Sequence, residues 1–398
     1  MKVALVCDWL TNYGGGEKVL LELHRLYPDA PIYTSQYDPK GIDWFKDADV
    51  RTGKLQKYPV KMRRLIGPLR QRYFSHLDLS EYDLVISVTG AEAKAVKAPN
   101  GVHICYCHVP TQYYWQMYRE YLKNPGFGFF NPIVRLVFRL AVGPLRRVDL
   151  KAAREVDYFV TISEYAKEQI KQAYGREATI IHPPVEIDSF KRKGANATCP
   201  CPRPKGRADT LRAALAKSLR SVEHTAFAPS SYYITTSRQV NWKRIDLAVK
   251  ACMMTQRSLL VIGEGPEHKK LIKMAKGFDK IKFLPKMGKE ELAEYLSSAK
   301  GYLFPSLEPF GIAPVEALAA GCPVIAFHEG GVRDYIKDGK NGILFDEQTA
   351  KSLANAILCF EKKKFDREKV SKTADGFDVK RFDKEIKDYI KKHKNISV

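Results

Sequence analysis

The sequence has few of the features that mark secreted, metal-binding or membrane-spanning proteins. Its eight cysteines include no Cys-x-x-Cys pair, and Cys105/Cys107 and Cys199/Cys201 have a spacing that suits zinc poorly. The longest apolar stretch, residues 133–145, is interrupted by two arginines and would span about 20 Å as a helix, against a bilayer core of about 30 Å. The apolar run at residues 3–7 is too short for a signal peptide. We therefore expect neither a disulfide scaffold nor a membrane span, although residues 133–145 could lie on a membrane.

Acidic residues are also scarce, with 45 Asp and Glu against 66 Lys and Arg, a net charge of +21. An excess of this size points to an anionic partner: nucleic acid, an acidic membrane surface or a phosphorylated substrate. The 398 residues, 45% of them apolar, are enough for two or three globular domains with sizeable cores. The charge is uneven, because residues 51–77 contribute +8 and residues 191–230 contribute +7.

Two stretches, residues 51–77 and 121–148, contain no acidic residue at all and mix basic with aromatic and aliphatic side chains. This composition suits a surface that lies on the anionic inner leaflet of the plasma membrane, and a solvated basic face is the alternative. In the first stretch we single out Lys61, Arg63, Arg64 and Arg70 as membrane or acceptor contacts. Nucleic acid is disfavoured as a partner, since no RRM, KH or zinc-finger pattern accompanies the charge.

Short apolar runs alternate with helical patterns, and the series occurs twice. The strand-like runs are residues 3–7, 32–35, 84–88, 102–107, 158–162 and 179–181, then 232–235, 259–262, 281–284, 301–304, 324–327 and 342–345. Helical patterns between them cover residues 17–26, 112–122, 164–174, 244–254, 267–275, 289–298 and 313–320. Apolar strands alternating with helices are typical of buried parallel sheets, so the sequence predicts two doubly wound α/β domains. Ligands of such sheets bind at the carboxyl ends of the strands, which would put the site in the cleft between the domains.

The junction between the two series is unlike either flank. Residues 191–230 join a Pro- and Cys-rich segment to a basic Ala/Leu stretch. This segment is either a flexible linker or an insertion, even one read out of frame, and we assign it no catalytic role. The predicted organisation is an N-terminal domain at 1–190, this basic segment at 191–230, a C-terminal domain at 231–376 and a terminal helix at 377–398.

Two loops have the composition of phosphate sites. Gly14-Gly15-Gly16 follows the first strand and opens a helix, where glycines allow close approach and the helix offers unpaired N–H groups. The Gly-x-Gly-x-x-Gly fingerprint is absent, so a plain tight turn is the alternative. In the second series, Arg238 and Lys243 follow a strand and could converge on a diphosphate, or form a basic surface loop.

Residues 304–324 carry the most specific pattern: a strand, a loop, a helix and then Gly-Cys-Pro before another strand. Glu308 lies in the loop at the strand's carboxyl end, and Glu316 lies about one turn into the helix. Both carboxylates can accept hydrogen bonds from sugar hydroxyls, while Gly311 and Ile312 present backbone N–H groups to an anion. Incidental glutamates on a solvated helix are the alternative, which this context disfavours.

This pattern, Glu308-x7-Glu316 with Phe310-Gly311-Ile312 inside it, resembles the signature of the retaining GT-B glycosyltransferases known as family 4. His108, in the run Cys-Tyr-Cys-His-Val-Pro, resembles that family's His-x-Pro element. The glycine loop and the Arg238/Lys243 segment also resemble its elements. Within the family, the opening and the His108 region look most like bacterial mannosyltransferases of surface-polysaccharide and O-antigen assembly.

The resemblance implies the GT-B fold, in which two Rossmann-like domains face a cleft and a C-terminal helix crosses back to the N-terminal domain. It implies that His108 lies at the sugar and acceptor and that Glu308 contacts the donor sugar. Arg238 and Lys243 would neutralise the leaving diphosphate, so no metal or other cofactor is expected. The donor-binding residues that it implies are Gly14, Gly15, Gly16, Arg238, Lys243, Gly263, Met287, Phe310, Gly311, Ile312 and Glu316.

The implied reaction is transfer of mannose from GDP-mannose, with retention, to a glycan or a polyprenyl-diphosphate-linked acceptor at the cytoplasmic face of the membrane. The loops expected around the base, residues 263–266 and 285–287, do not distinguish GDP from UDP. A UDP-sugar donor therefore stays open, as does the oligomeric state. A sugar-nucleotide epimerase is disfavoured by the intact Glu308-x7-Glu316 element, and a non-catalytic basic membrane-binding protein is the remaining alternative.

Overall fold

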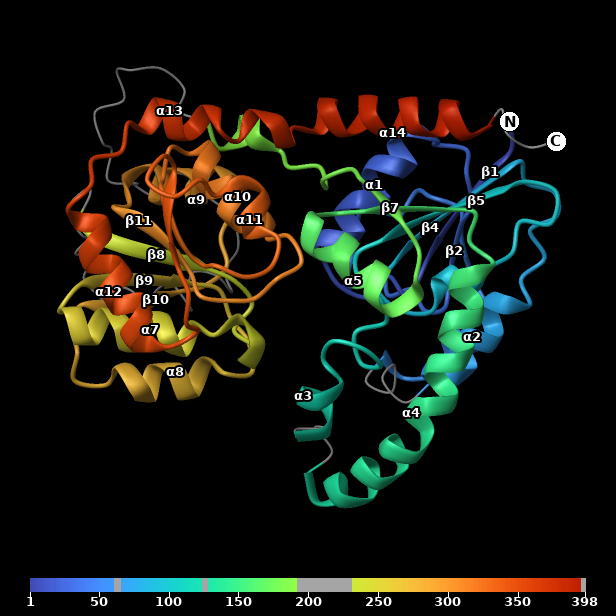
Figure 1. The fold of residues 1–398 in the computed structure, drawn as a ribbon, viewed down its shortest axis with the longest axis horizontal. Coiled ribbons are helices and arrows are strands. Elements are labelled where there is room, and N and C mark those ends of the chain that lie inside the picture. Colours follow the sequence, from blue (N-terminus) through green and yellow to red (C-terminus); the bar gives the residue numbers. More distant parts are fainter. Residues whose placement is uncertain (61–65, 124–127, 192–230, 395–398) are drawn as a thin grey trace, which may run out of the picture. The chain divides into compact units, whose positions relative to one another are not determined.

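The computed structural model describes residues 1–60, 66–123, 128–191 and 231–394, and these divide into two compact units (Figure 1). Unit 1 comprises residues 1–185 together with the C-terminal segment from Phe377, and unit 2 comprises residues 186–376. Of the basic junction predicted at 191–230, only Lys191 lies within the described residues. Its ammonium lies 2.9 Å from a carboxylate oxygen of Asp375.

Unit 1 is built on a seven-stranded sheet in the order β3-β2-β1-β4-β5-β6-β7, and every pair of neighbours is parallel. The strands are β1 (Val3–Cys7), β2 (Ile32–Thr34), β3 (Val50–Thr52), β4 (Leu84–Thr89), β5 (Val102–Cys107), β6 (Tyr158–Thr161) and β7 (Ala178–Ile180). The four longest strands are almost entirely buried, as a sheet covered on both faces requires. The sequence missed β3, an edge strand whose Val-Arg-Thr run is short and largely exposed.

The helices of unit 1 connect its strands, except for the last one, which follows unit 2 in the chain. They are α1 (Gly15–Leu26), α2 (Gly67–Ser75), α3 (Tyr118–Lys123), α4 (Asn131–Arg154), α5 (Glu164–Tyr174) and the C-terminal α14 (Val379–Lys394). Helix α14 packs on this unit: Phe382 meets the ring of Tyr106 edge-on at 6.1 Å, and Arg381 donates to the carbonyl of His182. The C-terminal helix therefore belongs to the N-terminal unit, as the predicted fold class requires.

One predicted helix is wrong in extent. Residues 112–122 carry a helical pattern, but the helix α3 begins only at Tyr118, and turns precede it. The cause is that neighbouring aromatic side chains are pulled to different buried carboxylates. The hydroxyl of Tyr113 donates to Glu92, and the indole N–H of Trp115 donates to Asp149 at 2.7 Å.

Unit 2 holds a six-stranded parallel sheet in the order β10-β9-β8-β11-β12-β13. The strands are β8 (Tyr232–Thr236), β9 (Ser258–Ile262), β10 (Ile281–Leu284), β11 (Gly301–Phe304), β12 (Val324–Phe327) and β13 (Gly342–Phe345). The helices are α7 (Ile245–Thr255), α8 (His268–Ala275), α9 (Lys289–Ser298), α10 (Ile312–Ala319), α11 (Val332–Tyr335), α12 (Ala350–Glu361) and α13 (Arg367–Lys372). Side chains of α7 and α12 fill the core on one face of this sheet.

Two doubly wound parallel sheets are thus present, as the alternating pattern predicts. The apolar cysteines behave as small core residues, since Cys7, Cys105, Cys252 and Cys322 are all buried free thiols.

Candidate active site

The best candidate site in unit 2 lies where its strand order reverses. Strand β8 is followed in the chain by β9 on one side, whereas its other neighbour is β11, so the switch point falls between β8 and β11. Open α/β sheets bind their ligands at such a point, beyond the carboxyl ends of the strands. Lys243 follows β8 and Glu308 follows β11, and Nζ of Lys243 lies 2.6 Å from Oε1 of Glu308. Their side chains are 22% and 18% exposed, so the pair is reachable from solvent.

Glu308 is held through both its side chain and its backbone. Ser306 Oγ donates to the same Oε1 at 2.9 Å, and the backbone carbonyl of Glu308 accepts from the N–H of Gly331 at 2.9 Å. Gly330, at φ +88°, allows this approach, because a Cβ there would lie 2.3 Å from that carbonyl. Both described contacts of the Glu308 side chain use Oε1. The loop therefore fixes the carboxylate before any ligand arrives.

The loop that leads into α10 is held in place by Tyr335. Its hydroxyl donates to the carbonyls of Phe310 and Gly311 at 2.7 and 3.1 Å, and its ring meets that of Phe310 at 5.3 Å. Gly311 has φ +94°, and a Cβ there would lie 2.8 Å from the Tyr335 hydroxyl, so this position needs glycine. The side chain of Phe310 is buried in the unit. The backbone of residues 310–312 is thus what this loop can offer a ligand.

A buried tyrosine joins β11 to the end of β8 beside the motif. The hydroxyl of Tyr302, on β11, donates to the carbonyl of Thr236 at 3.0 Å. Burial raises the pKa of Tyr302, and the carboxylates of Glu308 and Glu316 raise it further. The hydroxyl of Tyr302 thus fixes the end of β8 against β11, within the electrostatic influence of both carboxylates. Sequence reasoning missed Tyr302, because a tyrosine inside an apolar strand reads as core.

The other residues predicted to bind the donor contact different parts of unit 2. Arg238 is exposed, with its guanidinium 5.9 Å from the ring centre of Trp242, and Met287 is half-buried in the loop after β10. Gly263 has φ +118°, and a Cβ there would lie 2.3 Å from the carbonyl of Ser237. Its glycine is thus explained by the neighbouring loop. Among the described residues, no recorded contact joins Arg238 or Met287 to the Lys243–Glu308 pair.

Arg244 is a brace that the sequence did not single out, although it adjoins Lys243. It has φ +50°, pairs with Asp246 at 3.1 Å and donates to Gln348 Oε1 at 3.2 Å. The amide of Gln348 in turn donates to the carbonyl of Pro305. Arg244 therefore ties the loop after β8 to the loop after β11, which positions both members of the Lys243–Glu308 pair.

Unit 1 has its own switch point, between β1 and β4. Asp8 follows β1, and its carboxylate accepts from the hydroxyl of Thr89 and from the N–H groups of Gly90 and Ala93, all within 3.0 Å. This carboxylate fixes the turn after β4. Its hydrogen bonds are structural ones, to groups of the unit itself.

The glycine loop and His108 meet at this edge. A Cβ on Gly16 would lie 2.7 Å from Nε2 of His108, so the imidazole rests against the backbone at the start of α1. A Cβ on Gly14 would meet only the far end of the flexible Glu17 side chain, and Gly15 is simply the first residue of α1. The structure therefore brings together Gly16 and His108, and among these glycines it requires glycine most strictly at Gly16.

His108 is neutral at physiological pH. Burial lowers its pKa to about 4, even though the nearby Asp8 works in the opposite direction. A neutral imidazole can share a hydrogen bond with a hydroxyl but brings no positive charge. This fits a group that contacts a sugar better than one that binds phosphate.

The membrane prediction for Arg70 is wrong. Arg70 is 1% exposed, its Nε lies 2.6 Å from Oε2 of the fully buried Glu92, and its guanidinium stacks over Trp9 at 4.7 Å. Such a side chain cannot reach a lipid surface. Lys61, Arg63 and Arg64 lie outside the described residues.

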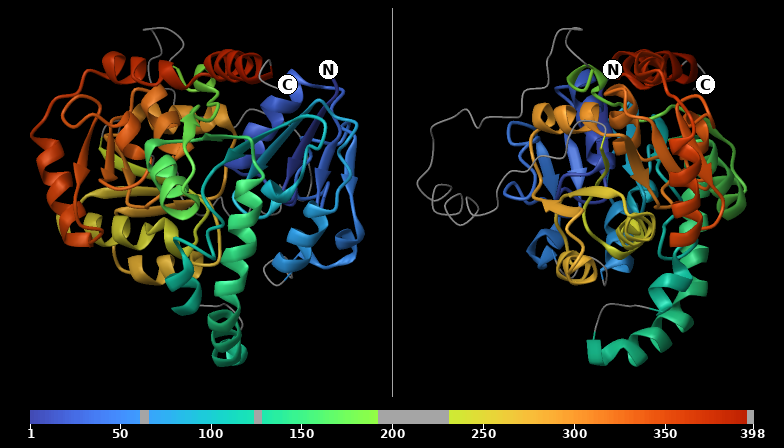
Figure 2. Two further views of the ribbon diagram at one scale, coloured as in Figure 1. Left: turned by 45° about the vertical axis from the view of Figure 1, so that its right-hand side comes forward. Right: turned by 90° about the vertical axis from the view of Figure 1, so that its left-hand side faces the viewer.

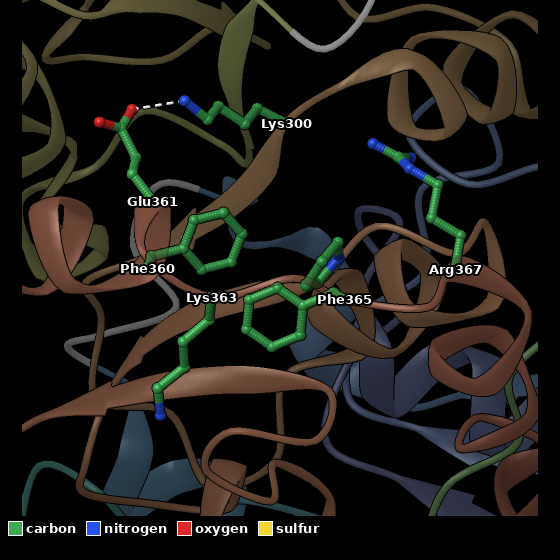
Figure 3. A pocket seen from close by; sticks show the side chains of 7 residues that line it. Lys300, Phe360, Glu361, Lys363, Phe365 and Arg367 are labelled. Atoms are coloured by element: carbon green, nitrogen blue, oxygen red, sulfur yellow. Dashed lines mark hydrogen bonds and ion pairs between the residues drawn. The ribbon is translucent and has the colours of Figure 1, made fainter.

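One small cavity, of about 140 Å³, lies away from all these residues (Figure 3). Lys300 and Pro323, which line it, directly precede β11 and β12, so it is at the amino ends of the strands. The labelled Lys300 ammonium lies 2.6 Å from the carboxylate of Glu361. Within the described ranges, no cluster of three His, Cys, Asp or Glu side chains is arranged to hold a metal ion.

Comparison with known sequences supports the motif assignment for unit 2. Residues 221–376 match the family described as glycosyl transferases group 1. A GDP-mannose-dependent alpha-(1-6)-phosphatidylinositol monomannoside mannosyltransferase of Mycolicibacterium smegmatis is 24% identical over 54% of this chain and 56% of its own. A D-inositol 3-phosphate glycosyltransferase of Streptomyces griseus is 27% identical over 45% of this chain and 40% of its own. The chain thus spans about half the length of the curated relatives that it matches.

Solved structures resemble the chain over nearly its whole length. The Anabaena protein HepE in complex with UDP has a TM-score of 0.65 at 19% identity, covering 98% of this chain and 100% of its own. Sucrose-phosphate synthase from Thermosynechococcus elongatus has a TM-score of 0.67 at 17% identity and covers both chains completely. These likenesses confirm the predicted GT-B fold class.

Proposed function

We propose that this chain is a retaining glycosyltransferase that takes mannose from GDP-mannose. The observation that carries the proposal is the Lys243–Glu308 pair at the β8/β11 switch point, inside the segment that matches glycosyl transferases group 1. A carboxylate held beside a cation at a strand edge can bind a sugar hydroxyl and a phosphate in one place. The choice of GDP-mannose rests on the relatives named for that donor.

Unit 2 would supply the chemistry at the donor. Breaking the bond between the anomeric carbon and the diphosphate oxygen leaves negative charge on the departing nucleotide. Lys243, Arg238 and the backbone N–H groups at the start of α10 would stabilise that charge without reorganising. Glu308 would bind the sugar hydroxyls, and Glu316, one turn into α10, would bind the ribose. Gly263 and Met287 would border the base.

Unit 1 would supply the remaining groups through its glycine loop and His108. The neutral imidazole would exchange a hydrogen bond with a hydroxyl of the sugar or of the acceptor. Its position depends on Gly16, since any larger residue there would displace the ring.

The acceptor in this proposal is a glycan or a polyprenyl-diphosphate-linked sugar of surface-polysaccharide synthesis. The enzyme would work at the cytoplasmic face of the membrane, peripherally attached to anionic lipid. Its excess of positive charge supports attraction to such a surface.

A UDP-sugar donor is the second candidate, because HepE, similar in fold, was solved in complex with UDP and with UDP-glucose. A donor panel separates the two. Purified protein is given GDP-, UDP- and ADP-sugars with a polyprenyl-diphosphate-linked acceptor, and the anomeric configuration of the product is read by NMR. We expect turnover of GDP-mannose with retention. Turnover of UDP-sugars alone would replace the donor, and inversion or no turnover of any donor would contradict the proposal.

A further inference from the structure

The N-terminal half of α4 leaves apolar side chains uncovered. Within unit 1 this part of the helix projects away from the sheet (Figures 1 and 2). We define the outer face of α4 by Ile133, Leu136, Val137 and Leu140 on its uncovered side, together with Phe129 and Phe130 in the 3-10 turn that directly precedes the helix. All six are more than half exposed, with Phe129 at 93% and Leu140 at 72%. Large apolar side chains gathered in this way mark an interaction surface.

The spacing of these residues makes a continuous stripe. Positions 133, 136, 137 and 140 follow the i, i+3, i+4, i+7 rule, so their side chains share one side of the helix. The neighbouring side is already occupied by α3: Phe138 meets the ring of Tyr118 at 5.4 Å, and Arg135 donates to the carbonyls of Leu122 and Lys123 at 2.8 Å each. The helix thus has one side packed within its own unit and one side left apolar and uncovered.

The other end of α4 is firmly anchored. Asp149 is 1% exposed and accepts from Thr111, Trp115 and Tyr174 while pairing with Lys94 at 2.6 Å. Burial alone would lower the pKa of Lys94, but Asp149, together with Cys107 and Cys105, raises the pKa overall. The outer face is therefore presented on a rigid support.

The charge around the outer face selects its partner. No acidic residue occurs from position 121 to 148, whereas Arg139 and Arg147 are exposed on the same helix. Arg139 lies beside the apolar stripe, where it can reach a phosphate at the level of the headgroups. A second copy of this chain would bring arginines against arginines, which disfavours a homodimer through this face.

We infer that the outer face of α4 lies on an anionic bilayer, with its apolar side chains among the acyl chains and Arg139 at the lipid phosphates. By length and composition, the segment Gly128–Arg154 is the one helix in the described part of the chain that could cross a membrane. However, Val142, Asp149, Ala152 and Ala153 are buried within unit 1. The part before Val142, one side of which packs on α3, spans only about 20 Å of helix, which suits lying in the interface and not crossing it. Of the two acid-free stretches predicted to lie on a membrane, this assigns the contact to the one at residues 121–148, and it does not rest on the proposed reaction.

Flotation of the full-length protein with vesicles tests this inference without donor or acceptor. We expect the protein to float with phosphatidylglycerol/phosphatidylcholine vesicles and much less with phosphatidylcholine alone. The double variant Leu136→Glu/Leu140→Glu should lower the floated fraction roughly tenfold or more, since two exposed leucines that would enter the bilayer are replaced by charges. Leu69→Glu is the control, because Leu69 is an exposed leucine of α2 outside the outer face, at 47% against 60% for Leu136 and 72% for Leu140, and this variant should float as the unchanged protein does.

A second measurement needs no loss of binding. Phe129→Trp places a fluorophore on the outer face, and brominated anionic lipids should quench the emission that this substitution adds. Failure of the unchanged protein to float, equal flotation of the double variant, or absence of quenching would each overturn the inference. So would a dimer that the double variant dissociates with no effect on vesicle binding. None of these outcomes bears on donor turnover, which is measured separately.

Discussion

Both sheets have charged pairs near their switch points, at the carboxyl ends of the strands, but the pairs differ in how far they are exposed to solvent. At the switch point of unit 2, the Lys243–Glu308 pair is about one-fifth exposed and is held by a hydroxyl and by loop backbone. Near the switch point of unit 1, the pairs Arg70–Glu92 and Lys94–Asp149 are at most 1% exposed. A pair that solvent reaches can exchange its partner for a ligand, whereas a buried pair mainly holds loops in place. We therefore interpret the carboxyl end of the sheet in unit 2 as a ligand-binding site, and the buried pairs of unit 1 as structural.

The largest effect should come from breaking a brace in unit 1. Arg70→Met leaves the Glu92 carboxylate buried without its cation, which should cost about 3–5 kcal/mol of unfolding free energy. Denaturant unfolding measures this loss, and hydrogen exchange of peptides from each unit locates it. Arg72→Met, at an exposed arginine on the same helix, should change stability by less than about 0.5 kcal/mol. Equal effects of the two substitutions would contradict the distinction between buried, paired charges and exposed ones.

Acid should weaken unit 1 before unit 2. Burial lowers the pKa of His103 to about 3 and that of His108 to about 4, so between those values and about 6.5 only the unfolded chain takes up these protons. Stability should therefore fall as pH drops from about 6.5 towards 4, by roughly 2–3 kcal/mol for His103.

In unit 2, the hydrogen bonds from Arg257 and Lys300 lower the pKa of Glu361 to about 2, against burial. The stabilisation from this carboxylate is present above about pH 4.5 and is lost only below it. Unfolding at a series of pH values, followed by hydrogen exchange, checks the order of the two losses. His103→Gln keeps a partner for Ser87 and should flatten the profile of unit 1, and the exposed His76→Gln should leave it unchanged. A profile that His103→Gln leaves as steep would contradict the assignment.

The open edge should bind diphosphate through its cation. Lys243→Met should weaken the affinity for GDP roughly 10- to 100-fold, because a charge-assisted contact to phosphate is lost. Calorimetric titration measures this, with the exposed Lys250→Met of α7 as the control of equal charge. An unchanged affinity for GDP in Lys243→Met would mean that the ion pair between Lys243 and Glu308 is structural and does not bind the ligand.

The smallest effect separates two glycines of one loop. Gly16→Ala drives a methyl group into the imidazole of His108 and should cost about 1–3 kcal/mol, whereas Gly14→Ala should be close to neutral. Thermal unfolding compares them, and the NMR signals of His108 report the displaced ring. The reverse order of effects would show that His108 does not rest on Gly16.

Much of the fold could be predicted from the sequence, because parallel strands that are buried on both faces consist of nearly continuous apolar residues. Six predicted runs, among them residues 102–107 and 301–304, match β5, β11 and four other strands without a shift. Strand β3 escaped, since an exposed edge strand needs no apolar residues. The helix predicted at 112–122 begins only at Tyr118, because Tyr113 and Trp115 donate hydrogen bonds to Glu92 and Asp149, which are distant in sequence.

The site was predictable where a motif is local and not where contacts are distant. Glu308 and Glu316 stand eight positions apart on one loop and helix, so their proximity follows from the sequence. The pairing of Lys243 with Glu308, the role of Tyr302 and the burial of Arg70 depend on strand order, which no single segment encodes. A basic run looks the same in sequence whether its arginine is solvated or paired inside the unit.

The central claim is that the carboxylate of Glu308 acts on the donor sugar, and donor turnover by Glu308→Gln tests it most directly. Steady-state release of GDP from GDP-mannose is compared in the unchanged protein, in Glu308→Gln and in the exposed Glu294→Gln of α9. The account predicts a loss of roughly 10²- to 10³-fold in Glu308→Gln, with affinity for GDP within about threefold and no loss in Glu294→Gln. Turnover by Glu308→Gln at the rate of the unchanged protein would contradict it.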